Sequence, residues 1–336
     1  MAPDVSPAGH ISYDALAARL AEIFVGEGVP DWVAAILARN CAMCERDGTY
    51  SHGVFRIPGY RATIRSGTIN LAAEPAIERV ATSFLRVAAA GGYAQPALAR
   101  ALPDVREMVA QTGVAVVAIR DSHHFSALWP DLEPFAELGL VALTMVAGGP
   151  TVMPRGAKRL VFGTNPIAFA TPVAGARPLI MDFATSTMSN GDLRIARDEG
   201  RRVPLGTGLG RDGRDTEDPD EILTHGGLLP FGGHKGAALS LMVEVLASGL
   251  TGGHFSHEVD LAAYPGSLTP RTGQLLIVVD PARGGNDGFA ERVAGLLTLL
   301  RESGLDRLPS DRRYRYRDAA MARGIPVTDT IRALFT

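Results

Sequence analysis

The chain has 336 residues, of which 46% are hydrophobic and 21% are charged, and its formal net charge is −3. This length suffices for two domains or for one large core with an accessory layer, and the composition is that of an ordinary globular protein. A slightly acidic chain without a basic run lacks the electrostatic footprint of a nucleic-acid-binding protein. Its first residues do not resemble a signal peptide, and its apolar runs are too short to span a bilayer. We therefore expect a cytoplasmic protein with neither a nucleic-acid nor a membrane partner.

The N-terminal part of the chain has the apolar periodicity of helices. Leu16, Leu20 and Phe24 recur at helical intervals and predict a first helix after residue 12. A second stripe that includes Trp32 predicts a helix over Asp31–Arg46, for which Asp31 is a plausible N-cap. A third helix is expected to end near residue 66.

Two cysteines, Cys41 and Cys44, form a single C-x-x-C pair inside the second predicted helix. A redox dithiol is activated at a helix N-terminus that follows a strand, which is a different setting. No second cysteine or histidine pair stands at a zinc-binding spacing. We therefore expect two buried thiols one helical turn apart and no metal site. A thiol-redox protein or a non-catalytic ligand-binding protein remains the alternative from another class.

From residue 77 onward the periodicity changes to that of alternating strands and helices. Residues 197–221 are charged and rich in glycine and aspartate, which predicts a long surface loop. A last helix is expected after the basic turn Leu308–Arg313. The predicted strands are Ile77–Val80, Phe84–Ala89, Val114–Arg120, Leu140–Val146, Leu160–Ala170, Leu179–Asp182 and Leu275–Val279, and the predicted helices are Gln95–Gln111, Asp131–Glu137, Ala237–Leu250 and Phe289–Ser303.

The segment that follows the second predicted helix concentrates reactive side chains between glycines. His52 lies between Ser51 and Gly53, and Arg56 follows four residues later. If the segment turns helically, His52 and Arg56 lie on one face. A proton-transfer group beside a fixed cation suits a small substrate that carries a carboxylate next to a reacting double bond. The alternative is an N-capped helix with a buried histidine and a surface arginine.

A literal G-x-G-x-x-G occurs at Gly208–Gly213, but it lacks the preceding strand and the following helix that a dinucleotide fingerprint needs. We therefore exclude a Rossmann site there. Three other turns are better candidates for anion binding: Ser122–Leu128, Asp182–Ser186 and Gly232–Gly236, the last with Lys235. Within the first turn, His123 and His124 are adjacent and should point to opposite faces, so at most one is expected to face a site.

Taken together, these motifs resemble the type-2 malate/L-lactate dehydrogenase family. The resemblance runs from about residue 12 to about residue 330. It implies an α/β (α+β) malate/L-sulfolactate dehydrogenase-like fold that is not a Rossmann fold, with a central mixed or antiparallel sheet and a helical domain built from both termini. It also implies a homodimer that transfers a hydride between NAD(P) and a carbonyl or imine beside a carboxylate. The motifs are Ser51–Gly53 with Arg56, His124-Phe125, Phe162–Phe169, Asp182–Ser186 and Gly232–Gly236.

The resemblance also divides the chain into three parts. Residues 1–75 would form a helical segment that carries the catalytic histidine, residues 76–290 the NADPH-binding and catalytic domain, and residues 291–336 helices that pack with the N-terminal segment.

Within this family, the chain is most similar to the Δ1-piperideine-2-carboxylate/Δ1-pyrroline-2-carboxylate reductases. This similarity implies NADPH-dependent reduction of these cyclic imino acids to L-pipecolate and L-proline, as in lysine degradation. The hydroxy-acid dehydrogenases of the family usually carry lysine where this chain has Asp192, so a 2-hydroxy-acid dehydrogenase acting on malate, lactate or ureidoglycolate is the alternative. The motifs are Ser122–Asp131, Ser189–Asp192, Leu229–Gly236, Thr269–Val278 and Leu308–Tyr314.

The resemblance assigns roles to residues of this chain. His52 would be the acid/base group, with Ser51 and Asp192 as a relay that orients it, and Arg56 with Thr164 would bind the substrate carboxylate. The chain has Ser310 where the resemblance implies a glycine, so the backbone approach there is expected to differ. The residues expected to hold NADPH are His124, Phe125, Ser126, Ala127, Leu128, Asp182, Phe183, Ala184, His234, Lys235, Ser310, Asp311 and Arg312.

Overall fold

The computed structural model describes residues 9–260, 262, 265–268, 271–285 and 287–335. Thr269 and Pro270 of the Thr269–Val278 motif lie outside the described part, as do residues 1–8, 261, 263, 264, 286 and 336 of the three expected divisions of the chain. In the described part, no helix is long and apolar enough to cross a membrane.

The first helices agree with the apolar stripes of the sequence. They are α1 (Tyr13–Gly26), α2 (Asp31–Arg46) and, after two short turns, α3 (Ile57–Arg65). Ser12 caps α1 by accepting a hydrogen bond from the Ala15 amide at 3.1 Å. The prediction that Asp31 caps α2 is wrong by one residue, because Pro30 holds the cap position and Asp31 begins the helix.

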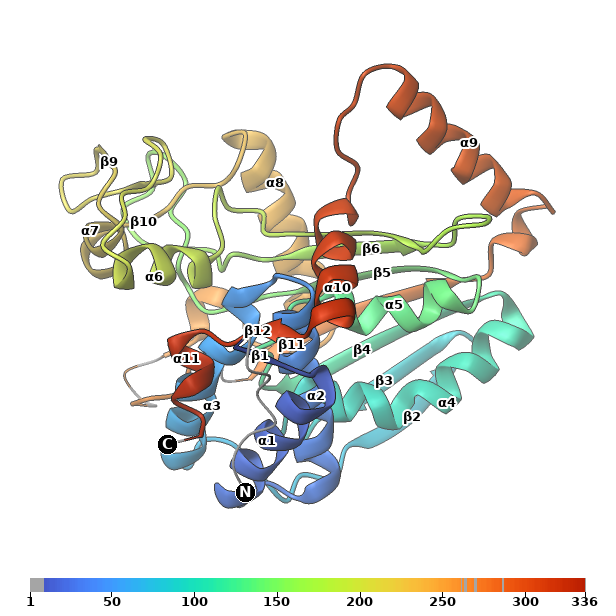
Figure 1. Ribbon diagram of the computed structural model, residues 1–336, viewed down its shortest axis with the longest axis horizontal. Coiled ribbons are helices and arrows are strands. Elements are labelled where there is room, and N and C mark those ends of the chain that lie inside the picture. The colour runs from blue at the N-terminus through green and yellow to red at the C-terminus, as the bar shows by residue number, and fades with distance from the viewer. Residues whose placement is uncertain (1–8, 261, 263–264, 269–270, 286, 336) are drawn as a thin grey trace.

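The centre of the fold is a seven-stranded mixed sheet with the order β2-β3-β4-β11-β5-β6-β7 (Figure 1). Strands β3 and β4 pair in parallel, whereas the other neighbours pair in antiparallel orientation. This arrangement confirms the expected mixed sheet. The strands are β2 (Ala76–Ala81), β3 (Phe84–Ala88), β4 (Val114–Ser122), β5 (Val141–Val146), β6 (Ile167–Thr171), β7 (Leu179–Phe183) and β11 (Thr272–Val279).

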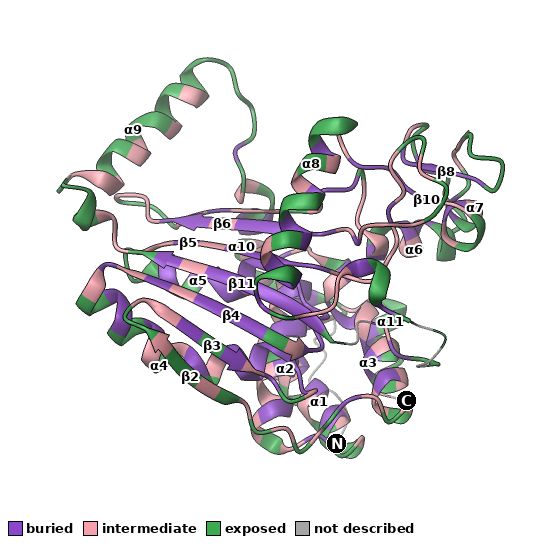
Figure 2. Ribbon diagram, turned by 180° about the vertical axis from the view of Figure 1, so that it is seen from behind, coloured by how far each residue is buried: buried purple, intermediate pink, exposed green. Residues whose placement is uncertain are grey.

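Helices cover both faces of this sheet, as the purple strands in Figure 2 show. On one face, α4 (Ala94–Thr112) and α5 (Trp129–Glu137) bury the main hydrophobic core. On the other face, α8 (His234–Val243) continues into a π-helical turn, Glu244–Gly249, which packs against β5 and β11. Burial on both faces explains the nearly continuous apolar sequence of β4, β5 and β11.

The two ends of the chain meet in one helical unit. Strand β1 (His10–Ile11) pairs with β12 (Ile325–Pro326). In the sequence, β12 stands between α10 (Asp311–Arg323) and α11 (Asp329–Arg332). Ile11 shares a core with α1, α2 and residues of α11. Helices α1 and α11 accordingly lie on the same side of the molecule in Figure 1, whereas α9 (Phe289–Glu302) extends away from the body.

The expectation of a surface loop at residues 197–221 is wrong. This region follows α6 (Asn190–Asp198) and contains β8 (Gly208–Leu209), β9 (Asp215–Thr216) and α7 (Pro219–His225), which with β10 (Gly227–Leu228) form a small three-stranded sheet unit. Two-residue strands are too short for an alternating pattern to show in the sequence. The Gly208–Gly213 motif spans β8 and the turn toward β9, which confirms that it is not a Rossmann site.

The predicted strand Leu160–Ala170 is also shorter than expected, because β6 begins only at Ile167. Asn165 has a φ of 41°, in the left-handed region, and Pro166 follows it without a backbone donor.

Cys41 and Cys44 are both buried and free, which confirms the expectation of two buried thiols inside the second helix.

A buried ion cluster fastens α10 to the rest of the fold. One guanidinium nitrogen of Arg317 lies 2.5 Å from Asp47 and 2.8 Å from Glu133. The exposed fractions of the Arg317, Asp47 and Glu133 side chains are 15%, 0% and 7%. The guanidinium groups of Arg313 and Arg317 also lie over the ring of Trp129, at 4.8 and 5.7 Å from its centroid. Helix α10 is thus held to the rest of the fold by a buried cation and the two buried carboxylates that it pairs with.

Replacing Arg317 by methionine should therefore be strongly destabilising, because it leaves two buried carboxylates without their shared cation. We expect a loss of roughly 3–5 kcal/mol in the free energy of unfolding, measured by urea titration. Arg202→Met is the matched control, since Arg202 pairs with Glu217 on the surface, and it should cost about 1 kcal/mol or less. Equal losses in the two variants would contradict a special role for the buried cluster.

Candidate active site

The segment that carries His52 is a pair of tight turns rather than the start of a helix. Residues Tyr50–His52 and Val54–Arg56 each form a 3-10 turn, with Gly53 between them. A Cβ on Gly53 would lie 2.4 Å from a carboxylate oxygen of Glu45, so only glycine fits this position without displacing that side chain. The segment after Gly53 therefore does turn helically, first as a 3-10 turn and then as α3, and His52 and Arg56 come together as that condition predicted.

His52 lies between a hydroxyl and a guanidinium. Its Nδ1 is 3.2 Å from Ser51 Oγ, and its Nε2 is 3.4 Å from a terminal nitrogen of Arg56. Arg56 is fixed in turn by its Nε, which donates to the Ser51 carbonyl at 2.7 Å. Because a guanidinium only donates, we assign the imidazole proton to Nδ1, facing Ser51, and leave the lone pair on Nε2.

The pKa of His52 lies well below its ordinary value. Burial is the largest cause, and the positive charge of Arg56 and the neighbouring His124 add to it. The imidazole is therefore neutral at neutral pH, with an unprotonated Nε2 beside a cation. Such a group accepts a proton only when the charge near it changes.

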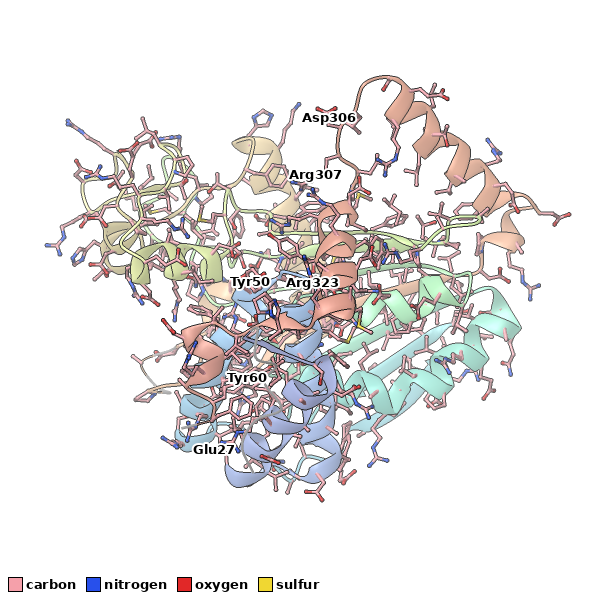
Figure 3. All side chains as sticks on the ribbon, viewed as in Figure 1. Glu27, Tyr50, Tyr60, Asp306, Arg307 and Arg323 are labelled. Atoms are coloured by element: carbon pink, nitrogen blue, oxygen red, sulfur yellow. The ribbon has the colours of Figure 1, made fainter. Side chains whose placement is uncertain are left out.

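A cavity of about 1440 Å³ opens beside this imidazole. It is larger than the roughly 300–1,000 Å³ of a typical small-molecule pocket, and it has room for a dinucleotide together with a small acid. Figure 3 labels two of its lining residues, Tyr50 beside α10 and Arg307 on the segment that leads into α10. The predicted site residues that line it are Ser51, His52, Ser126, Ala127, Leu128, Thr164, Asp182, Phe183, Ala184, Asp192, Ser310 and Arg312.

Other predicted cofactor residues lie away from the cavity lining. Phe125 is buried in the helical core, stacked on Tyr60 at 4.5 Å between ring centroids. His234 and Lys235 are exposed at the start of α8, and Asp311 pairs with Arg301 at 3.0 Å. The structure therefore does not bring these residues to the cavity.

The two adjacent histidines diverge. His124 is buried with Nε2 3.1 Å from Gln95 and 3.5 Å from Asp131, and it contributes to the lowered pKa of His52. His123 packs against the ring of Tyr93 instead, at 6.5 Å between centroids. His124 thus lies near His52 but is not among the residues that line the cavity.

Asp192 reaches the cavity from the first turn of α6. The cap residue Ser189 accepts a hydrogen bond from the Asp192 amide at 3.0 Å and donates one to its carboxylate at 2.8 Å. A Cβ on Gly191 would lie 2.9 Å from the Cβ of Ser51 and 3.2 Å from Arg56, so the start of α6 packs directly on the catalytic loop. Among the described residues, the hydrogen bonds join His52 to Ser51 but Asp192 to Ser189, and the expected relay is not closed in this conformation.

Two polar side chains fix the walls of the cavity. The carboxylate of Asp182 accepts hydrogen bonds from the amides of Leu128 and Trp129 at 2.8 and 2.9 Å, which ties β7 to the start of α5. Burial raises the pKa of this carboxyl. Ser310 has a φ of 75°, and its hydroxyl bonds to both the amide and the carbonyl of Ile180 at 2.8 Å. The left-handed backbone explains the glycine that the resemblance implies there, and the two hydrogen bonds hold the serine in its place.

Sequence reasoning missed several residues that line the cavity, among them Glu45, Trp129 and Tyr316. Glu45 follows Cys41 by four residues, on the buried face of α2. A carboxylate on an otherwise apolar helical face is the one signal that would have indicated it.

Comparison with known proteins agrees with this geometry. Residues 11–334 match the malate/L-lactate dehydrogenase family, so the chain belongs to that family of NAD(P)-dependent oxidoreductases. A Δ1-pyrroline-2-carboxylate/Δ1-piperideine-2-carboxylate reductase from Pseudomonas syringae pv. tomato is 53% identical over 96% of this chain and 94% of its own length.

Solved structures show the same fold. The Δ1-piperideine-2-carboxylate reductase from P. syringae pv. tomato superposes with a TM-score of 0.94 and 52% identity, over 97% of this chain and 98% of its own. The sulfolactate dehydrogenase from Methanocaldococcus jannaschii, at 24% identity, superposes with a TM-score of 0.85 over 96% and 94% of the two chains. The expected malate/L-sulfolactate dehydrogenase-like fold is confirmed.

The electrostatic setting of His52 can be tested directly. Arg56→Gln should raise the pKa of His52, because it removes a positive charge that disfavours the imidazolium. The measurement is an NMR titration of the histidine ring carbons in the free protein. His123 is the internal control: burial lowers its pKa to about 4 without a contribution from Arg56, so its titration should not move. An unchanged His52 titration would contradict the assigned influence of Arg56.

Proposed function

We propose that this chain catalyses the NADPH-dependent reduction of Δ1-piperideine-2-carboxylate and Δ1-pyrroline-2-carboxylate to L-pipecolate and L-proline. The 53% identity to a reductase with these two substrates in its name, over 96% of the chain, carries this proposal. Because the products are amino acids, we also propose a cytoplasmic role in amino acid metabolism, including lysine degradation.

Arg56 and Thr164 are proposed to bind the substrate carboxylate. Thr164 lines the cavity, and Arg56 stands beside His52 with its guanidinium already oriented by the Ser51 carbonyl. A carboxylate that pairs with Arg56 offsets the charge that lowers the pKa of His52. Substrate binding therefore raises the proton affinity of the imidazole at the moment when an acid/base group is needed.

The reaction adds one hydride to the carbon of the C=N bond and leaves one proton on the nitrogen. When bound, the reduced nicotinamide supplies the hydride. His52 Nε2 carries no proton in the free protein, so it can accept a hydrogen bond from an iminium; it can give a proton to a neutral imine only after it has taken one from solvent. Ser51 holds the opposite side of its ring. The negative charge of Asp192 favours the iminium, whereas a lysine there would oppose it.

The residues present fit a phosphorylated dinucleotide. The cavity extends from His52 to Leu308–Ser310 and Arg312, at the N-terminus of the 13-residue helix α10. Helix N-termini and arginines are suited to phosphate groups. We propose that Ser126–Leu128, Phe183-Ala184, Ser310 and Arg312 contact NADPH, while His124, Phe125, His234, Lys235 and Asp311 stay predictions without a place in the lining.

The direct test offers the purified protein NADPH with Δ1-piperideine-2-carboxylate and, separately, with pyruvate or oxaloacetate, and follows the loss of the reduced nicotinamide absorbance. We expect turnover of the imine. His52→Ala should lower kcat by about 10²–10⁴-fold, because it removes the acid/base group. Turnover restricted to the keto acids would contradict the imine proposal and leave the family assignment intact.

The charge at position 192 provides a second test. Asp192→Lys should reduce imine turnover and shift activity toward keto acids, because it replaces a charge that favours an iminium by one that opposes it. Asp192→Asn is the matched control, since it removes the charge without adding the opposite one. Its ratio of imine to keto-acid turnover should fall between those of the wild type and Asp192→Lys. A lysine variant with an unchanged ratio of imine to keto-acid turnover would contradict this role of the charge.

We also propose that the protein is a homodimer. In the described part of the chain, α9 has no buried residue, although it carries Phe289, Val293 and four leucines, of which Leu296 and Leu299 are 56% and 60% exposed. The green helix that extends from the body in Figure 2 is this segment. Leu241, Val245 and Leu250, on and after α8, are exposed as well. An apolar helix that finds no core in its own chain is suited to a second copy.

Leu299→Glu should therefore weaken the dimer, because it places a charge in the apolar stripe of α9. Sedimentation velocity over a range of protein concentrations measures the change. Glu302→Gln, at the end of the same helix, is the control and should leave the sedimentation coefficient unchanged. A wild-type protein that sediments as a monomer at every concentration would contradict the dimer.

A further inference from the structure

Glu45 is a buried residue that the sequence analysis did not identify and that has no role in the proposed reaction. It is 6% exposed, lies in the last turn of α2 and lines the cavity beside the catalytic loop. Its Oε1 accepts a hydrogen bond from the Val54 amide at 2.7 Å. The carboxyl also occupies the space against Gly53, within 2.4–2.8 Å of where a Cβ would be. One side chain thus contacts Gly53, which lies between the two 3-10 turns, and Val54, with which the second turn begins.

This contact sits at the centre of the catalytic loop. His52 immediately precedes Gly53, and Arg56 follows Val54 by two residues. The loop has no α-helical hydrogen bonds of its own before α3 begins at Ile57. A shift at the Val54 amide would therefore move the imidazole and the guanidinium relative to each other.

We propose that Glu45 is a positioning residue: its carboxylate holds the loop that carries His52 and Arg56, and protonation of Glu45 loosens this hold. The kinetic part of this inference rests on the proposed function, whereas the structural part does not. A carboxylate is a stronger acceptor for a backbone amide than a neutral carboxyl group.

The titration of Glu45 falls in the neutral range. Burial raises its pKa to about 7, and the Val54 hydrogen bond opposes this rise only in part. Its neighbours do not titrate there. Burial raises the pKa values of Cys41, Cys44 and Tyr50, so these groups stay neutral, and the pKa of His52 is lowered. The arginines beside Glu45 or along this wall of the cavity, Arg56, Arg312 and Arg313, keep their positive charge.

The proposal therefore expects an ionisation near neutral pH in the kcat/KM profile that disappears when Glu45 cannot titrate. Glu45→Gln tests this expectation, because glutamine has nearly the same shape, still offers an oxygen to Val54 and does not titrate. The measurement is kcat/KM for Δ1-piperideine-2-carboxylate with NADPH across pH. The ratio of wild type to variant at each pH cancels the ionisation of the substrate itself.

We expect this ratio to fall about tenfold between about pH 8 and about pH 6, as the ionised fraction of a group with a pKa of about 7 does. Glu133→Gln is the matched control. Glu133 is a second buried glutamate whose pKa burial raises, but it pairs with Arg317 away from the loop. Whatever its basal activity, this control should keep the wild-type pH dependence. A constant ratio of wild type to Glu45→Gln would overturn the proposal.

Hydrogen exchange tests the same inference without substrate. In the free protein, exchange of the peptide that contains Val54, corrected for intrinsic rates, should show less protection at about pH 6 than at about pH 8. Glu45→Gln should remove this difference. If the wild type reduces no imine at all, the proposed function fails and this measurement still decides the role of Glu45. Equal pH dependence of exchange in the two proteins would overturn it.

Discussion

The arrangement of this site depends on one contact, that of the Arg56 guanidinium with the imidazole of His52, which is favourable while the imidazole is neutral and unfavourable once it is protonated. The two groups are 3.4 Å apart, and the backbone carbonyl of Ser51 holds the arginine in place. A cation beside an imidazole suppresses its protonation, as the lowered pKa of His52 shows. The same cation attracts a carboxylate, and an occupied Arg56 no longer suppresses the proton. If Arg56 binds the substrate carboxylate as proposed, substrate binding raises the proton affinity of the imidazole through a charge that is already present.

The contacts that hold this loop and the cavity walls join distant parts of the chain. Asp182 connects β7 to the start of α5, Ser310 connects α10 to the edge of β7, and Arg317 connects α10 to α2 and α5. Each is a polar contact whose loss would leave a buried donor, acceptor or charge without its partner. Local helix and strand propensities do not fix the walls. The cavity takes shape only when the C-terminal helices return to the N-terminal unit.

The sequence predicted those parts of the fold and site that depend on local order. The strands β4, β5 and β11 are buried on both faces, and this burial is visible in the sequence as long apolar runs that predicted the strands. Ser51, His52 and Arg56 come together because they are neighbours in the chain. The small sheet around Leu209 was missed because its strands have two residues each, and the loss of a strand before Ile167 depends on the left-handed Asn165.

Residues that act through tertiary contacts were harder to place. Lys235 has the sequence context of a phosphate-binding lysine, but its helix, α8, packs on the far face of the sheet and leaves it in solvent. Glu45 stands in no recognisable sequence motif, because its proposed role depends on its contact with Val54, in the loop that follows its helix, α2.

Asp192 shows how a charge can act without a fixed hydrogen bond. Its side chain bonds to Ser189, as expected for a residue in the first turn of a helix, where a negative charge is favoured. Gly191 nevertheless brings the start of α6 so close to Ser51 and Arg56 that a side chain at this position would not fit without a shift. The charge of Asp192 opposes the effect of burial on the pKa of Arg56, whereas Arg194 on the same helix adds to that effect. A lysine in this position would add a third cation beside Arg56 and Arg194, and it would remove the negative charge that is proposed to favour an iminium. Under this proposal, the sign of the charge at position 192 matters more than its hydrogen-bond partner.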